Sequence, residues 1–197
     1  MLQVKTFCGG YDHNFSYLLY DEESKEAVII DTAVDPELLF KFIKENKLKI
    51  KYAVIMHSHF DHTVDLNYYR KNNIDLVASE KTKEQVEIKV NDGDILKIGQ
   101  HELKVLETPG HIYDAICVLA GNKLFTSDTL FIGACGRIDL EGANSKEMEE
   151  SLEKLKQLPD NTIIFPGHDY GSTPSSTIGE QKKSNPYLKD KNGEEGI

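Results

Sequence analysis

One stretch decides how the whole chain is interpreted: His57-Ser58-His59-Phe60-Asp61-His62. It holds three of the seven histidines in the chain, together with one aspartate. It follows an apolar run over residues 52–56 that reads as a buried strand, and a strand end is a rigid place from which to direct side chains. Imidazole nitrogens and carboxylate oxygens are the ligands that suit zinc, iron or manganese. The stretch therefore predicts a metal site, in preference to a polar loop with solvent-exposed histidines.

Further candidate ligands follow other apolar runs along the chain. Asp31 ends the run Val28-Ile29-Ile30, and His111 closes Thr108-Pro109-Gly110-His111. Asp128 lies in Thr126-Ser127-Asp128-Thr129, and His168 lies in Phe165-Pro166-Gly167-His168. Each position combines a strand end with a turn, and for Asp31 an ordinary turn residue is the less favoured alternative.

These motifs, in this order, carry a family resemblance that spans essentially the whole chain. His57-x-His59-x-Asp61-His62 is similar to the HxHxDH signature of the metallo-β-lactamase superfamily. The chain looks most like the glyoxalase II-like branch, which includes hydroxyacylglutathione hydrolases and persulfide dioxygenases. The resemblance implies a four-layer αββα sandwich, in which two mixed β-sheets are flanked by helices. Composition and patterning alone predict only an α/β or α+β protein.

The resemblance also implies how the ligands are divided. His57, His59 and His111 would hold a first metal, Asp61, His62 and His168 a second, and Asp128 would bridge the two. Asp31 would orient a ligand histidine from behind. Two neighbouring cations repel each other, so an anionic bridge is physically reasonable, and a metal-bound hydroxide oriented by Asp61 would be a strong nucleophile. Zinc is the favoured metal, and iron or manganese also fit the donor set.

The secondary-structure pattern agrees with an α/β order. Residues 25–31 and 51–56 read as strands, and Asp35-Pro36 between them reads as the start of a helix. This strand–helix–strand order predicts a parallel pair in a mixed sheet. A second long helix is expected to be capped by Asn144 or Ser145. The last residues, from Asp190 on, are expected to be frayed.

Length and charge limit the classes of function. The 197 residues fit one domain over 1–197, without room for the extra C-terminal helical domain of full-length glyoxalase II. The net charge of −10 disfavours a nucleic-acid partner. No signal peptide or membrane span is visible, which favours a cytoplasmic protein and disfavours a secreted β-lactamase. Three scattered cysteines read as free thiols, and the sequence is compatible with a homodimer.

The loop after Asp128 is the second informative stretch. Gly133-Ala134-Cys135-Gly136-Arg137-Ile138-Asp139 resembles the GxCGRxD pattern of the glyoxalase II-like branch. Arg137 would bind a substrate carboxylate or pair with Asp139 to hold the loop. Cys135 is either a reactive thiol or a small buried one. Tyr170 and Tyr113 are candidate pocket walls for substrate, with a purely structural role as the alternative.

Two departures from the family pattern leave the substrate open. Ser127 stands before the bridging aspartate, where the family usually has glycine, and Ile112-Tyr113-Asp114-Ala115 follows His111. The favoured function is a dinuclear hydrolase that cleaves a thioester such as an S-acylglutathione or another glutathione-derived small molecule. The alternative is a mononuclear iron persulfide dioxygenase that uses His57, His111 and Asp128, a set nested within the larger one. A non-enzymatic metal-binding domain is a third, less favoured interpretation.

Overall fold

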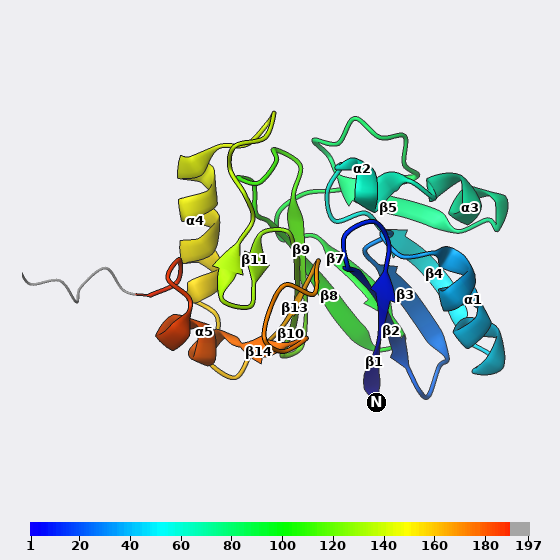
Figure 1. Cartoon of the computed structure of the whole chain (residues 1–197). Helices are drawn as coiled ribbons and strands as arrows, with labels where there is room; N and C mark the ends of the chain where they lie inside the picture. Colours follow the sequence, from blue (N-terminus) through cyan, green and yellow to red (C-terminus); the bar gives the residue numbers. More distant parts are fainter. Residues whose placement is uncertain (190–197) are drawn as a thin grey trace, which may run out of the picture.

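The computed structural model describes residues 1–189 as two β-sheets packed face to face, with helices on both outer sides (Figure 1). This is the αββα sandwich that the sequence predicted. The expectation of a frayed tail from Asp190 on concerns residues outside this range. No helix among residues 1–189 combines the length and apolar character that crossing a membrane requires.

The first sheet contains six strands in sequential order, β1-β2-β3-β4-β5-β6. Strands β3 and β4 run parallel, as the strand–helix–strand order predicted, and β5 continues the parallel pairing. The bounds are β1 Leu2–Gly9, β2 Asn14–Asp21, β3 Glu26–Ile30, β4 Lys49–Val54, β5 Asp75–Ser79 and β6 Ile88–Val90.

The second sheet also contains six strands, in the order β14-β13-β10-β9-β8-β7. Strands β10 and β13 are parallel, and β8, β9 and β10 form an antiparallel meander. A two-stranded ribbon, β11 with β12, follows β10. The bounds are β7 Ile95–Ile98, β8 His101–Glu107, β9 Ile116–Ala120, β10 Lys123–Ser127, β11 Leu130–Phe131, β12 Ala134–Cys135, β13 Ile163–Pro166 and β14 Ser176–Thr177.

The two helices whose starts the sequence predicted begin at side-chain caps. The Asp35 carboxylate accepts a hydrogen bond from Glu37 N, and Asn144 accepts from Lys146 N and Glu147 N. The bounds are α1 Pro36–Glu45, α2 Phe60–Thr63, α3 Leu66–Lys71, α4 Ser145–Lys156 and α5 Ile178–Ser184. Helices α1 and α3 cover the first sheet, and α4 and α5 cover the second (Figure 1).

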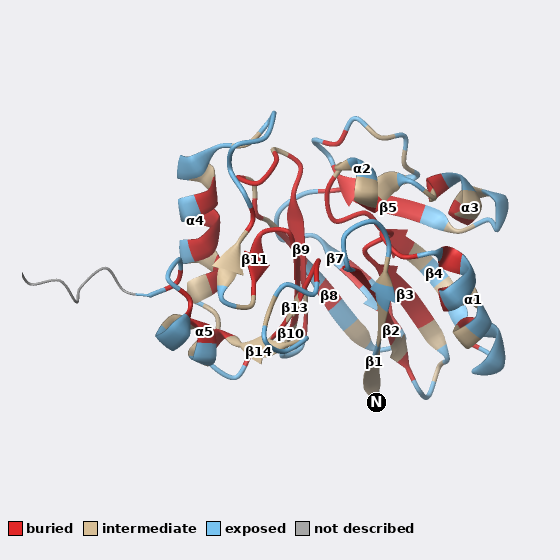
Figure 2. Ribbon diagram, viewed as in Figure 1, coloured by how far each residue is buried: buried red, intermediate tan, exposed pale blue. Residues whose placement is uncertain are grey.

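Three buried apolar layers hold the sandwich together (Figure 2). Strand β2 shows why: Leu19 points into the layer between the sheets, whereas Leu18 points toward the helices. Successive side chains of a strand face opposite sides, so a strand covered on both sides must be apolar throughout. The layer between the sheets includes Tyr17, whose hydroxyl donates to the Pro166 carbonyl at 2.6 Å.

The site lies at one edge of both sheets because of strand direction. The carboxyl ends of β3 and β4 meet there, as do those of β10 and β13. The predicted strand over 51–56 ends earlier, at Val54. Beyond it, Ile55 N still bonds to Val77 O in the first sheet, but Met56 O accepts from Ile116 N in the second sheet. The chain leaves the first sheet at this point, and this exit carries His57 between the two sheets.

Candidate metal centre

All seven predicted ligand residues lie together at this edge. Their side chains form three overlapping groups, and within each group the ligand atoms lie within 4.8 Å of one another. The groups are His57 with His59 and His111, His57 with His62 and Asp128, and Asp61 with His62 and His168. The first and third groups correspond to the two sets that the resemblance implied, and Asp128 lies between them.

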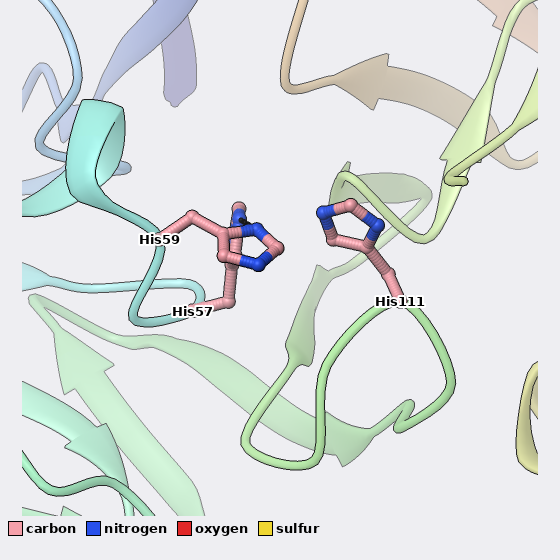
Figure 3. Close-up of side chains that lie close together, drawn as sticks. All are labelled: His57, His59 and His111. Carbon is pink, nitrogen blue, oxygen red and sulfur yellow. Dashed lines mark hydrogen bonds between the residues drawn. The ribbon is translucent and has the colours of Figure 1, made fainter. Parts of the chain in front are cut away.

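The first group joins the two halves of the molecule. His57 and His59 extend from the loop after β4, and His111 extends from the loop after β8, with its ring turned toward them (Figure 3). The nitrogens His57 Nε2 and His59 Nδ1 are 3.1 Å apart. His57 and His111 are buried, while His59 is half-buried. Of these three side chains, only that of His59 is therefore partly exposed to solvent.

The second group is assembled from the start of α2 and the loop after β13. His62 Nε2 lies 3.2 Å from Asp61 Oδ2, and His168 Nε2 lies 3.6 Å from the same oxygen. Asp128 is close to both groups: its carboxylate lies 3.6 Å from His62 Nε2, 3.5 Å from His111 Nε2 and 3.3 Å from His168 Nε2. Several ring nitrogens thus converge on one carboxylate.

The histidine ring nitrogens that point away from the centre of the cluster have hydrogen-bond partners. His111 Nδ1 donates to the Arg137 carbonyl at 2.8 Å, and His168 Nδ1 donates to the Asp12 carbonyl at 2.8 Å. A carbonyl can only accept, so Nδ1 carries the proton in both rings and Nε2 presents its lone pair to the site. His62 Nδ1 lies 2.6 Å from Asp31 Oδ1, deep in the protein. This is the carboxylate–histidine arrangement that orients metal ligands.

Asp31 is held in a backbone conformation that few residues adopt. Its φ is +65°, in the left-handed region where aspartate and asparagine are tolerated better than most residues. Its second oxygen, Oδ2, accepts a hydrogen bond from Ser127 Oγ at 2.7 Å. Ser127 Oγ also lies 3.3 Å from His57 Nδ1. Ser127, the residue directly before Asp128, therefore links Asp31 to His57.

Charges in the cluster are strongly coupled. Burial lowers the pKa of His62, but the Asp31 and Asp128 carboxylates outweigh burial and hold this pKa well above its ordinary value. Burial raises the pKa of Asp128, but His62 and His168 outweigh it and the net shift is downward. Burial, with His62 and His111 beside it, lowers the pKa of His57 well below its ordinary value. Near neutral pH the Asp128 carboxylate is ionised and the His57 ring is neutral, the forms that bind metals.

Two buried atoms show that the cluster fits a metal. Within residues 1–189, His111 Nε2 and Asp128 Oδ1 have no hydrogen-bond partner. A buried polar atom without a partner costs about 1–3 kcal/mol, so such atoms call for an explanation. Both lie among ring nitrogens that converge on Asp128. Nitrogen and carboxylate donors in this arrangement fit divalent zinc, iron or manganese.

Two contributors were missed at the level of the sequence. Asn14 is fully buried, and its Nδ2 donates to Asp61 Oδ2 at 2.8 Å and lies 3.4 Å from Nε2 of both His62 and His168. Asp12 accepts from His168 through its carbonyl and from the Tyr170 hydroxyl through its carboxylate. A single asparagine at the start of a strand carries no pattern, so no signal in one sequence could have found it.

The proposed substrate residues occupy different places. Arg137 forms a two-pronged pair with Asp139, with Nε to Oδ1 at 2.7 Å and Nη2 to Oδ2 at 2.8 Å. Tyr170 stacks on the His168 ring, with centroids 4.7 Å apart. Tyr113 lines a cavity of about 590 Å³ together with His59. Burial raises the pKa of the Cys135 thiol to about 11, so this thiol is unreactive near neutral pH.

Glycine is required on either side of Asp128. A Cβ added at Gly167 would lie 2.3 Å from Asp128 Oδ1, and one added at Gly136 would lie 1.9 Å from the Asp128 carbonyl oxygen. Gly167 has no positive φ, so its requirement is steric and not conformational. These two glycines let the chain close tightly around the carboxylate.

We expect Gly167→Ala to displace the Asp128 carboxylate and to lower both metal content and turnover. We expect turnover to fall about tenfold, because shifting a reacting group by a fraction of an ångström costs about this much in rate. Metal analysis and steady-state kinetics on the purified variant check this. Gly9→Ala is the matched control, since its new Cβ would meet only Val34 side-chain atoms. Equal effects of the two variants would contradict the steric account.

Comparison with known proteins gives one family. Residues 9–86 and 74–168 match the model of the metallo-β-lactamase superfamily. The mitochondrial persulfide dioxygenase ETHE1 of Mus musculus is 34% identical over 180 residues, which cover 88% of this chain and 71% of that protein. The hydroxyacylglutathione hydrolase of Prochlorococcus marinus (strain MIT 9312) is 39% identical over 157 residues, covering 76% and 63%.

Solved structures show the same similarity. The crystal structure of ETHE1 from Myxococcus xanthus superposes with a TM-score of 0.88 at 30% identity, covering 93% of this chain and 83% of that one. TTHA1623 in a di-iron-bound form superposes with a TM-score of 0.79 at 25% identity, covering 93% and 100%. The relatives with named activities thus include a dioxygenase and a hydrolase at similar identity.

Proposed function

Because the chain belongs to the metallo-β-lactamase superfamily, we propose that it is a two-metal hydrolase that cleaves a thioester such as an S-acylglutathione. The observation that carries this proposal is the second ligand group. Asp61, His62 and His168 converge beside Asp128, and Asn14 and Asp31 support them from behind. A single-metal site that used His57, His111 and Asp128 would not need this second buried group.

In the proposed site, His57, His59 and His111 would hold one metal, and Asp61, His62 and His168 would hold the other. The Asp128 carboxylate lies 3.3–3.6 Å from histidines of both groups, so it would be shared by the two metals. When bound, two divalent ions lower the pKa of a coordinated water and polarise the carbonyl oxygen of a substrate. Zinc is the favoured metal for both positions, and the di-iron form of TTHA1623 supports iron as the other candidate.

The residues of the chain orient the reactants. Asp61 is the half-buried carboxylate of the second group, and Asn14 fixes one of its oxygens. We propose that Asp61 orients the attacking water. Hydrolysis then adds water across the thioester, so the carbon–sulfur bond breaks and a carboxylate, a thiol and a proton are released. Tyr113 and Tyr170 are assigned to the substrate pocket, and Arg137, already paired with Asp139, is assigned to holding its loop.

The second candidate is a persulfide dioxygenase with one iron. The 34% identity to mouse ETHE1, over 71% of that protein, favours it. His57, His111 and Asp128 would then be the two-histidine, one-carboxylate set of an oxygen-activating iron site. All three belong to the larger set, and a one-iron site of this kind would leave Asp61, His62 and His168 without a metal of their own.

The direct test is a paired assay on one preparation. We expect release of free thiol from S-D-lactoylglutathione, followed with a thiol reagent, and no oxygen uptake with glutathione persulfide in an oxygen electrode. Asp61→Asn is expected to reduce thiol release strongly. Oxygen uptake with the persulfide, together with no thiol release from any thioester, would replace the hydrolase with the dioxygenase.

A further inference from the structure

A cavity beside His59 is the feature that bears on substrate choice. It has a volume of about 590 Å³. The loop after β5 and the segment before α4 supply its opposite sides, and both rise past the strand ends at the top of Figure 1. Its lining residues are His59, Lys83, Ile112, Tyr113, Leu140, Glu141 and Gly142. Since His59 belongs to the metal centre, a molecule bound at the centre would extend into this cavity.

Lys83 is the cationic residue of this lining. Its Nζ lies over the Tyr113 ring, 5.3 Å from the ring centroid, and both residues line the cavity. Among the described residues, neither Glu141 nor any other carboxylate forms an ion pair with Lys83. The positive charge is therefore available to a ligand.

Arg137 contrasts with Lys83 at this point. Asp139 binds one edge of its guanidinium group through Nε and Nη2, and the Arg137 side chain lines a different cavity, beside Met148 and Tyr187. Arg137 does not line the cavity beside His59, so a carboxylate bound in that cavity would meet Lys83 first. The carboxylate-binding role that the sequence offered to Arg137 is thus better filled by Lys83.

We propose that Lys83 selects substrates that carry a carboxylate close to the thioester, with Tyr113 as the wall that positions the lysine. This inference rests on the proposed hydrolase function. Attraction between Lys83 and the carboxylate is worth more in a cavity that excludes part of the solvent than on an open surface. Glu141 lines the same cavity, and its negative charge repels the substrate carboxylate, so it weakens the preference for anionic substrates.

Two matched substrates test the proposal. S-Lactoyl-N-acetylcysteine carries a carboxylate that S-lactoyl-N-acetylcysteamine lacks, while the thioester is the same. Lys83 is exposed, so we expect Lys83→Gln to lower the ratio of kcat/KM for the anionic over the neutral substrate by about threefold to fivefold, the upper part of the range for one exposed charge pair. Glu141→Gln is expected to raise the same ratio, because it removes a like charge.

Lys89→Gln is the control, since Lys89 is an exposed lysine that does not line the cavity. The Lys89→Gln variant should have the same ratio of kcat/KM for the anionic over the neutral substrate as the unaltered enzyme. An unchanged ratio in Lys83→Gln, or a drop of equal size in Lys89→Gln, would overturn the proposal. A drop in Arg137→Gln alone would return the role to Arg137.

Binding measurements separate this inference from the hydrolase proposal. The non-hydrolysable thioethers S-(2-hydroxypropyl)-N-acetylcysteine and its cysteamine counterpart can be titrated calorimetrically into metal-loaded protein. If no thioester is cleaved, the hydrolase proposal fails. A weaker binding of the anionic thioether to Lys83→Gln still supports the carboxylate site, and equal binding to both proteins refutes it.

Discussion

Replacing Asp128 with asparagine is expected to lower thioester turnover by about 10²–10³-fold, the range for loss of a principal electrostatic group in an active site. Asparagine keeps the shape of the side chain and removes its charge. The carboxylate lies 3.3–3.6 Å from Nε2 of three histidines, and its Oδ1 has no hydrogen-bond partner among residues 1–189. Without that charge, two neighbouring cations would repel each other unscreened. Metal content should fall below two per chain.

Kinetics and metal analysis on the same sample check this prediction. Asp75→Asn is a matched control, because Asp75 is an exposed aspartate at the start of β5. It should retain full turnover and metal content. If Asp128→Asn retains both as well, Asp128 does not bridge the metals and the two-metal account loses its central residue.

Removal of the Asp31 side chain is expected to weaken the second metal by about 10- to 100-fold, the usual effect of losing a carboxylate that orients a ligand histidine. Asp31→Gly is the variant of choice, because glycine adopts the φ of +65° without strain. The variant leaves His62 Nδ1 and Ser127 Oγ without their partner. That loss should also lower the free energy of unfolding by about 1–3 kcal/mol.

A metal titration and a thermal unfolding curve measure the two effects. Lys47→Gly controls for a new glycine at positive φ, since Lys47 is exposed, has a φ of +55° and precedes β4, whereas His57 follows that strand. Asp31→Asn keeps the side-chain shape and should retain part of the affinity. Metal affinity in Asp31→Gly equal to that of the unaltered protein would show that Asp31 only shapes the turn.

The residue pattern could predict the α/β class and the residues that gather at the site, and the family resemblance supplied the four layers. The motif at 57–62 follows an apolar run, and the other ligand positions also follow apolar runs, so strand ends and donors were visible together. Parallel pairing of β3 with β4 followed from the intervening helix. Long apolar strands and clustered histidines are strong local patterns. The family resemblance then supplied their arrangement in two sets, which spacing does not contain.

The supporting residues could not be predicted, because they depend on contacts between distant parts of the chain. Asn14 reaches Asp61 and His168 only because β2 lies beside the loop after β13, where Phe15 N bonds to Gly167 O at 2.7 Å. Lys83 is one of many lysines in the sequence, and its place over Tyr113 follows from the course of two loops. The pairing of Arg137 with Asp139 was one of two sequence interpretations, and the geometry favours it.

The most direct test of the central claim is the metal stoichiometry of protein purified without chelator and without oxygen. We expect close to two divalent ions per chain, held with similar affinity, in protein that cleaves thioesters. A stoichiometry close to one iron per chain, with the group of Asp61, His62 and His168 unable to take up a second ion on titration, would contradict it.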